Sequence, residues 1–240
     1  MRLHRGEAPV YFAIGDIHGN DKLLEALYER ILAAARNLGS RDKCLVHLGD
    51  YIDRGPNSRG VIARVRQGLA GFRTVCLRGN HEQLMLDAVR ERTQSAIGQW
   101  VINGGAQTLL SYGYVHGSPA AAIDDLVITA AHDITWLEEL PLTHYAGRYL
   151  FVHAGIVPGR ALERQQAKDL LWIRDAFLRD RRDHGFVVVH GHTPIETGLP
   201  ELRANRINLD TGAAYGGPLT AVMLDPASDE PPQFLQVKPR

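Results

Sequence analysis

The segment Val10-Tyr-Phe-Ala-Ile14 has the pattern of a buried strand, and it runs into the glycine-rich loop Gly15-Asp-Ile-His-Gly-Asn20. A helix is expected directly after it, because apolar residues recur at steps of three and four up to Leu38, and Gly39 ends the pattern. Residues 44–48 and 74–77 are two further apolar runs, each followed by a polar loop and an amphipathic stretch. Three strand–loop–helix units in succession predict a βαβαβ arrangement with a mostly parallel sheet.

The second half of the chain has a different pattern. Residues 94–140 are predicted to be helical. Short strands bounded by turn residues are predicted beyond them, at residues 149–153, 186–189, 206–209 and 219–224. Two sheets with helices on their outer faces are the packing we expect from this order, which places the chain in the α/β (α+β) class. No linker separates the halves, so we expect one domain over residues 1–240.

Composition excludes several classes of protein. Lys+Arg and Asp+Glu both number 27 among the 240 residues, so the formal charge is zero, whereas a general nucleic-acid binder needs a basic excess. No apolar run approaches the roughly 18 residues of a membrane span. Residues 1–7 lack the apolar stretch of a signal peptide, so we expect a cytoplasmic protein. Cys44 and Cys76 lie within apolar strands and are expected to be free thiols.

Polar side chains gather in the loops that follow the predicted strands. Open α/β sheets bind ligands at the carboxyl ends of their strands, so we expect these loops to meet. In the first half the loops carry Asp16, His18, Asp50, Asp53, Arg54, Arg78, Asn80 and His81. Two later strand ends add His153 and His192.

The types of side chain in these loops favour a metal site. Asp16 and His18 are two residues apart, so in an extended segment they point the same way, and Asp50 can bridge two ions. Carboxylate, imidazole and amide ligands suit manganese, iron or zinc. Two such ions about 3.5–4 Å apart form a clamp for in-line attack at phosphorus, and neighbouring arginines can hold phosphate oxygens. A Gly-Asp pair after one strand is also common turn chemistry, but turns alone require neither the histidines nor Asn80.

The combination of motifs resembles the phosphoprotein phosphatase family of binuclear metallophosphoesterases, in its bacterial serine/threonine branch. The matching segments lie between residues 15 and 193: Gly15-Asp-Ile-His-Gly19, Gly49-Asp-Tyr-Ile-Asp-Arg-Gly55, Arg78-Gly-Asn-His-Glu82, His153-Ala-Gly155 and Gly191-His-Thr193. This resemblance implies the calcineurin-like metallophosphoesterase fold, a two-sheet β-sandwich flanked by helices in four layers. It also implies two divalent ions, with manganese expected first and iron or zinc as alternatives.

The resemblance further implies a role for each matching residue. The metal ligands would be Asp16, His18, Asp50 as the bridge, Asn80, His153 and His192. The substrate phosphate would be bound by Arg54, Arg78 and Arg174. His81 would be the general acid for the leaving group, and Asp53 would orient it.

The function implied is a metal-dependent serine/threonine protein phosphatase. It would hydrolyse phosphate monoesters of a phosphorylated protein or peptide by direct attack of a metal-bridging hydroxide; the sequence leaves the oligomeric state open. A dinucleoside polyphosphate hydrolase, acting on diadenosine tetraphosphate, is the alternative. Those relatives usually lack the run Tyr51-Ile-Asp-Arg54, which favours the protein phosphatase. An inactive phosphopeptide-binding module is disfavoured, because every ligand and the acid are present.

Some polar and aromatic residues are not assigned to the chemistry. His47 lies inside an apolar strand and is expected to be a core histidine, and His184 is expected at the surface. His190 either has no functional role or supports the ligand residues, and Asp210 is expected to be structural. Trp100 opens the segment Trp-Val-Ile-Asn-Gly-Gly, which either packs between helices or lines one side of the cleft.

Overall fold

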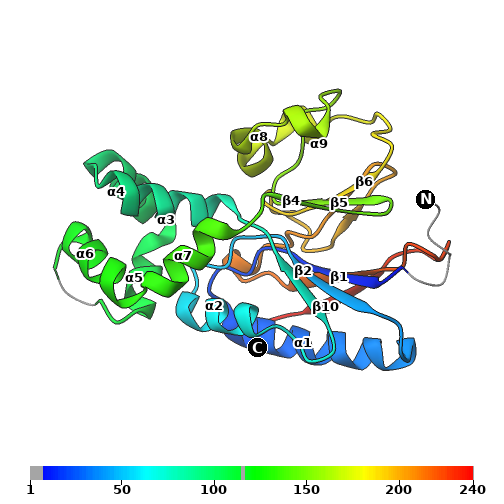
Figure 1. Ribbon diagram of the computed structural model, residues 1–240, viewed down its shortest axis with the longest axis horizontal. Coiled ribbons are helices and arrows are strands. Elements are labelled where there is room, and N and C mark those ends of the chain that lie inside the picture. The colour runs from blue at the N-terminus through cyan, green and yellow to red at the C-terminus, as the bar shows by residue number, and fades with distance from the viewer. Residues whose placement is uncertain (1–7, 115–116, 240) are drawn as a thin grey trace.

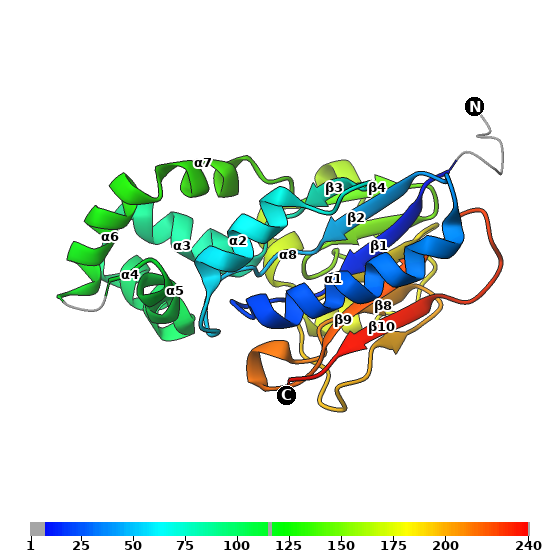
Figure 2. The same cartoon turned by 90° about the horizontal axis from the view of Figure 1, so that it is seen from below.

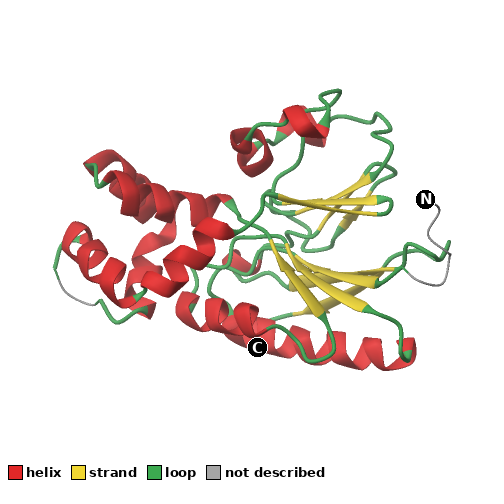
Figure 3. Ribbon diagram, viewed as in Figure 1, coloured by secondary structure: helices red, strands yellow, loops and turns green. Residues whose placement is uncertain are grey.

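A computed structural model describes residues 8–114 and 117–239 (Figures 1 and 3). Residues 1–7, from which we argued that a signal peptide is missing, lie outside the described residues. None of the described helices combines the length and the apolarity needed to cross a bilayer.

The first sheet has the strand order β10-β9-β1-β2-β3. Its strands are β1 (Val10–Ile14), β2 (Lys43–His47), β3 (Arg73–Cys76), β9 (Leu219–Leu224) and β10 (Gln233–Val237). As predicted, β1, β2 and β3 are parallel. The strands β9 and β10 extend the sheet in antiparallel fashion beyond β1, which makes the whole sheet mixed.

The second sheet has the order β4-β5-β6-β8-β7. Its strands are β4 (Thr143–Ala146), β5 (Tyr149–Val152), β6 (Val187–His190), β7 (Glu201–Leu202) and β8 (Arg206–Asn208). The central strands β5, β6 and β8 are parallel, and β4 and β7 close the two edges in antiparallel fashion. The sequence did not predict β4, β7 or β10.

Alternation along the strands builds the layers. Tyr11 and Ala13 belong to the core between the two sheets, whereas Phe12 and Ile14 belong to the core under the helices. The outer face of the first sheet carries α1 (Asp21–Ala35) and α2 (Ser58–Gln67), and that of the second carries α8 (Ala167–Trp172) and α9 (Asp175–Leu178) (Figures 1 and 2). This four-layer sandwich confirms the predicted fold class.

Five further helical segments form a helical lobe at one end of the sandwich (Figures 1 and 2). They are α4 (Gln94–Trp100), a π-helical turn (Val101–Gly105), α5 (Ala106–Ser111), α6 (Pro119–Thr129) and α7 (Ala131–Glu139), and α3 (Asn80–Glu91) joins them to β3. Short 3₁₀ turns occur at Arg36–Leu38, Leu162–Arg164 and Ala213–Tyr215. The helical prediction for residues 94–140 is therefore correct over 94–111, 119–129 and 131–139, while residues 115–116 lie outside the described residues. The π turn was not predicted.

Candidate metal centre and active site

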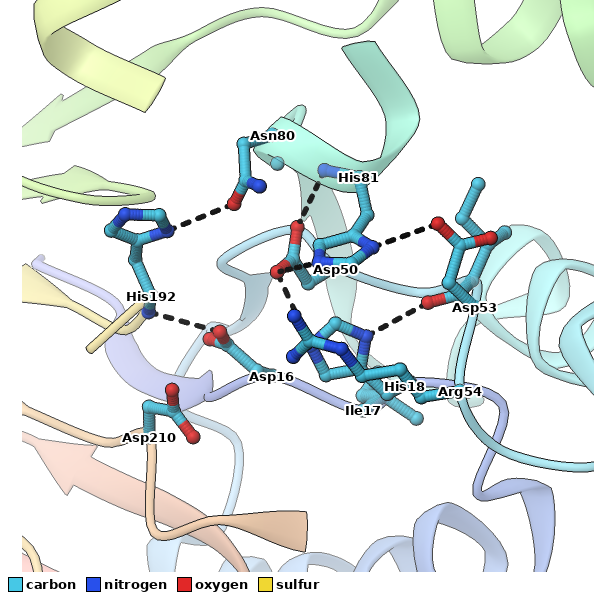
Figure 4. A network of polar contacts seen from close by, with 12 residues as sticks. Asp16, Ile17, His18, Asp50, Asp53, Arg54, Asn80, His81, His192 and Asp210 are labelled. Atoms are coloured by element: carbon cyan, nitrogen blue, oxygen red, sulfur yellow. Dashed lines mark hydrogen bonds and ion pairs between the residues drawn. The ribbon is translucent and has the colours of Figure 1, made fainter. Parts of the chain in front are cut away.

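The polar loops meet at one end of the sandwich, between the carboxyl ends of strands from both sheets (Figure 4). The first sheet contributes the loops after β1, β2 and β3, and the second contributes those after β5 and β6. All six residues predicted as metal ligands are buried: Asp16, His18, Asp50, Asn80, His153 and His192. The structure thus brings together side chains that are up to 176 residues apart in the chain.

Asp50 lies at the centre of this cluster. Its Oδ2 is 3.3 Å from His18 Nε2, and its Oδ1 is 3.5 Å from His153 Nε2. Ligand atoms of Asp16, Asp50 and His153 all lie within 4.8 Å of one another, as do those of His18, Asp50 and His81. A carboxylate with imidazoles on both oxygens has the arrangement expected of a bridging ligand.

The imidazole of His153 faces an oxygen that cannot donate a proton to it. His153 Nδ1 donates to the Leu48 carbonyl at 2.9 Å, and burial lowers the pKa of His153, so the neutral ring carries no proton on Nε2. That Nε2 is 2.8 Å from Asn80 Oδ1, which is itself 2.8 Å from His192 Nδ1. The lone pairs of His153 Nε2 and Asn80 Oδ1 thus face each other, which is the arrangement of two ligands of one cation.

The acidic residues of the cluster also fit a cation. Asp16 Oδ2 accepts the backbone N–H of His192 at 2.9 Å, but the buried Oδ1 has no hydrogen-bond partner among the described residues. Burial and the charges of Asp210 and Asp50 raise the pKa of Asp16 well above its usual value. A carboxylate crowded by other carboxylates is stabilised by a metal ion. The nitrogen and oxygen donor set is that of manganese, iron or zinc.

Next to the ligands lies the predicted acid with its partner. His81 Nδ1 donates to Asp53 Oδ2 at 2.7 Å, and both side chains are buried. This bond leaves His81 Nε2 free, 4.0 Å from Asp50 Oδ2 and directed toward the metal cluster (Figure 4). Asp53 also accepts hydrogen bonds from Trp100 and Thr108. No sequence motif indicated a role for Thr108.

Two of the three predicted phosphate-binding arginines contact histidines that are predicted metal ligands. Arg54 Nη1 is 3.1 Å from His18 Nε2, and Arg174 Nε is 3.2 Å from His192 Nε2. The guanidinium of Arg78 instead donates to the side chain of Gln83 and to backbone carbonyls at the end of α7. In this arrangement Arg78 anchors α7, and its role in phosphate binding stays a prediction.

The backbone of the site is held in an uncommon conformation. His18, Asp50, Asp53, Arg54 and His192 all have φ between 47° and 71°, in the left-handed region. Non-glycine residues adopt this region at a cost, and such residues cluster at functional sites. The loops are therefore shaped for the placement of their side chains rather than for local backbone preference.

The structure also places three histidines outside the cluster. His47 is buried, lies 2.8 Å from the Tyr28 hydroxyl, and has a pKa lowered by burial to about 3, so it is a core histidine as predicted. Burial likewise lowers the pKa of His190 to about 3. The prediction for His184 is wrong: its side chain is only 5% exposed because its ring stacks on Phe177.

This fold and this site define a metallophosphoesterase. Residues 10–219 match the model of the calcineurin-like phosphoesterases, and the chain belongs to that family, whose members depend on a binuclear metal centre. The resemblance read from the sequence motifs is thereby confirmed.

The relatives include both protein phosphatases and dinucleoside tetraphosphatases. The chain is 33% identical over 218 residues to serine/threonine-protein phosphatase 1 of Salmonella typhimurium (strain LT2), an alignment that covers 87% of this chain and 89% of that protein. It is 29% identical to a symmetrical bis(5'-nucleosyl)-tetraphosphatase of Acidovorax ebreus (strain TPSY), over 80% of this chain and 59% of that protein. A solved protein serine/threonine phosphatase from Saccharomyces cerevisiae has a TM-score of 0.58 at 15% identity, covers 98% of this chain and 81% of its own, and shows a common fold.

Proposed function

We propose that this metallophosphoesterase is a serine/threonine protein phosphatase that uses manganese. The similarity to the Salmonella phosphatase over nearly the full length of both chains supports this substrate class. The run Tyr51-Ile-Asp-Arg54, which distinguishes the phosphatases in the sequence, supplies both the partner of His81 and an arginine beside His18. The substrate would be a phosphorylated protein or peptide in the cytoplasm, without nucleic acid or membrane as partner.

Each group near the metal cluster has a task in monoester hydrolysis. Arg54 and Arg174 would bind the phosphate oxygens that do not take part in bond cleavage, and would offset their charge. His81 would donate a proton from Nε2 to the departing alkoxide, while Asp53 holds the ring by Nδ1. The two cations, when bound, lower the pKa of the attacking water and bind phosphoryl oxygens.

The observation that carries this proposal is the buried pair of His81 and Asp53 beside the ligand cluster. A serine or threonine alkoxide is a strongly basic leaving group, so its departure requires a proton. The nucleotide leaving group of a dinucleoside polyphosphate is weakly basic and departs as an anion. A proton donor held in place therefore favours the monoester.

A dinucleoside polyphosphate hydrolase remains the second candidate, because the Acidovorax tetraphosphatase aligns with 80% of this chain. Manganese-loaded protein should be assayed in parallel on a phosphoserine peptide and on diadenosine tetraphosphate. We expect the higher kcat/KM on the peptide. A strong preference for the dinucleotide would overturn the proposal in favour of the second candidate.

The metal requirement is tested in the same preparation. Exhaustive dialysis against EDTA should abolish turnover, and added Mn²⁺ should restore it, because the ligand set consists of nitrogen and oxygen donors. Full activity of the dialysed protein would contradict a metal mechanism. No turnover of p-nitrophenyl phosphate after Mn²⁺ loading would instead indicate an inactive phosphopeptide-binding module.

A further inference from the structure

The carboxylate of Asp53 accepts hydrogen bonds from the helical lobe as well as from His81. Its Oδ1 accepts hydrogen bonds from Thr108 Oγ1 at 2.6 Å and from Trp100 Nε1 at 3.0 Å. Its Oδ2 accepts from His81 Nδ1 at 2.7 Å and lies 3.2 Å from the same indole nitrogen. Asp53, Trp100 and Thr108 are all fully buried, so water does not compete for these bonds.

The same lobe holds the backbone of the loop that carries Asp53. Asp53 and Arg54 are consecutive left-handed residues, with φ of 71° and 67°. The Asp53 N–H donates to Thr108 Oγ1 at 2.9 Å and to Ser58 Oγ at 3.1 Å, and the Arg54 N–H donates to the Gly104 carbonyl at 3.2 Å. The lobe therefore fixes both the side chain that orients the acid and the backbone of the arginine beside His18.

The π-helical turn Val101–Gly105 is shaped for this contact. Gly104 has a φ of 110°, and a Cβ there would lie 2.7 Å from the Arg54 nitrogen. A Cβ on Gly105 would lie 2.6 Å from the Trp100 ring. Both glycines thus permit close approach, one to the loop and one to the indole. Inserted π turns occur frequently at functional sites, and here the turn is in direct contact with one.

We propose that Trp100 and Thr108 are positioning residues for leaving-group protonation, which act on His81 through Asp53. This inference rests on the proposed role of His81 as the acid. With both donors present, the Asp53 carboxylate cannot rotate about its χ2 angle without breaking buried hydrogen bonds. The His81 ring, held by that carboxylate, keeps its Nε2 directed at the cluster. Without the donors, the carboxylate and the ring turn more freely.

Variants that remove the hydrogen-bond donor of Trp100 or Thr108 but keep the size of the side chain distinguish this positioning role from a role in packing. Trp100→Phe keeps an aromatic ring in the core and removes the N–H, and Thr108→Val keeps the shape and removes the hydroxyl. Each variant should lower kcat on phenyl phosphate and on a phosphoserine peptide by about ten- to a hundredfold, the range for lost outer partners of an active-site group. The loss on p-nitrophenyl phosphate should be several-fold smaller, because its leaving group needs no proton. KM and the manganese content should not change.

Three further variants complete the kinetic test. Thr108→Ser restores the hydroxyl and should recover most of the activity lost in Thr108→Val. Trp136→Phe makes the same substitution in α7 of the same lobe, where the indole packs on Tyr51, and should keep wild-type kinetics on both substrates. His81→Ala should show a larger loss with the same dependence on leaving group. An equal loss on both aryl phosphates, or a loss of bound manganese, would overturn the inference and leave Trp100 and Thr108 with a structural role.

The test separates this inference from the proposed function. Phenyl phosphate and p-nitrophenyl phosphate differ in leaving group alone, so the comparison holds even if diadenosine tetraphosphate proves the better substrate. A readout without turnover is the ¹⁵N-histidine NMR spectrum. The Nδ1–H proton of His81 should be protected from exchange in the wild type and exchange faster in Trp100→Phe and Thr108→Val. Unchanged exchange in both variants would refute the inference whatever the activity.

Discussion

Substitution of Glu82 tests how the loop that carries Asp50 is held in place. Its carboxylate is fully buried and accepts four backbone N–H groups: Oε2 from Asp50 at 2.8 Å and Gly79 at 2.9 Å, and Oε1 from Tyr51 at 2.8 Å and Ile52 at 3.3 Å. The backbone of Asp50 itself lies in the left-handed region, with a φ of 54°. Glu82 therefore fastens the strained loop that carries the proposed bridging ligand to the first turn of α3.

The substitution Glu82→Gln has a magnitude that follows from these bonds. One carboxylate oxygen becomes an NH₂ group, so two of the four N–H donors lose their acceptor and face another donor. A buried donor left without a partner costs about 1–3 kcal/mol. The free energy of unfolding should thus fall by about 2–6 kcal/mol, out of a total of about 5–15 kcal/mol for a typical protein.

Urea unfolding of the protein in EDTA, followed by tryptophan fluorescence, measures this loss. Glu91→Gln is the matched control, because it makes the same change at an exposed residue of the same helix. Manganese titration of the folded variant should also show weaker binding, since Asp50 loses its fixed backbone. A change in unfolding free energy below about 0.5 kcal/mol, the range of ordinary surface substitutions, would refute this account of the loop.

The remaining predictions concern the phosphate contact, the metal pocket and the core. Arg54→Ala should lower kcat/KM without lowering manganese content; a parallel loss of metal would show that its role is structural. Gly191→Ala should abolish metal binding, because the new Cβ would lie 1.9 Å from Asp16 Oδ1; isothermal titration with Mn²⁺ checks this. His47 has a folded-state pKa lowered from 6.5 to about 3, so the unfolded chain binds the extra proton between these values and stability falls as the pH falls. The free energy of unfolding, measured by urea titration at pH 7, 6 and 5, should drop by up to about 1.4 kcal/mol per pH unit from this group. The slope should flatten in His47→Gln but not in His132→Gln, an exposed site.

Much of the fold could be predicted because its central strands are continuous apolar runs. The strands β1 and β9 were predicted with their observed bounds, and the other predicted strands agree within one residue at each end. The missed strands β4, β7 and β10 all lie at sheet edges. Edge strands bury less surface, so Gln233–Val237 carries polar residues and only half-buried apolar ones, and its pattern is weak.

The convergence of the six candidate metal ligands was predictable for a different reason. Each ligand follows a strand end, and parallel strands bring their ends together, so spacing along the chain carries the spatial information. The contacts of Trp100 and Thr108 with Asp53 depend on how the helical lobe packs against the loop that carries Asp53. No local sequence pattern predicts this packing. The same is true of Arg78, whose partners at Glu138 and Leu140 lie 60 and 62 residues away.

The cluster of candidate metal ligands spans the gap between the two sheets. Its members from the first sheet are Asp16, His18, Asp50 and Asn80, and those from the second are His153 and His192. A cation bound there would link the two sheets, whereas the unfolded chain does not hold these residues together and would bind the cation weakly. Binding of one ion would then raise the free energy of unfolding by about 2.7 kcal/mol at a free-ion concentration one hundred times Kd. Under metal starvation the protein would lose abundance as well as turnover, as proteases remove the chains that open.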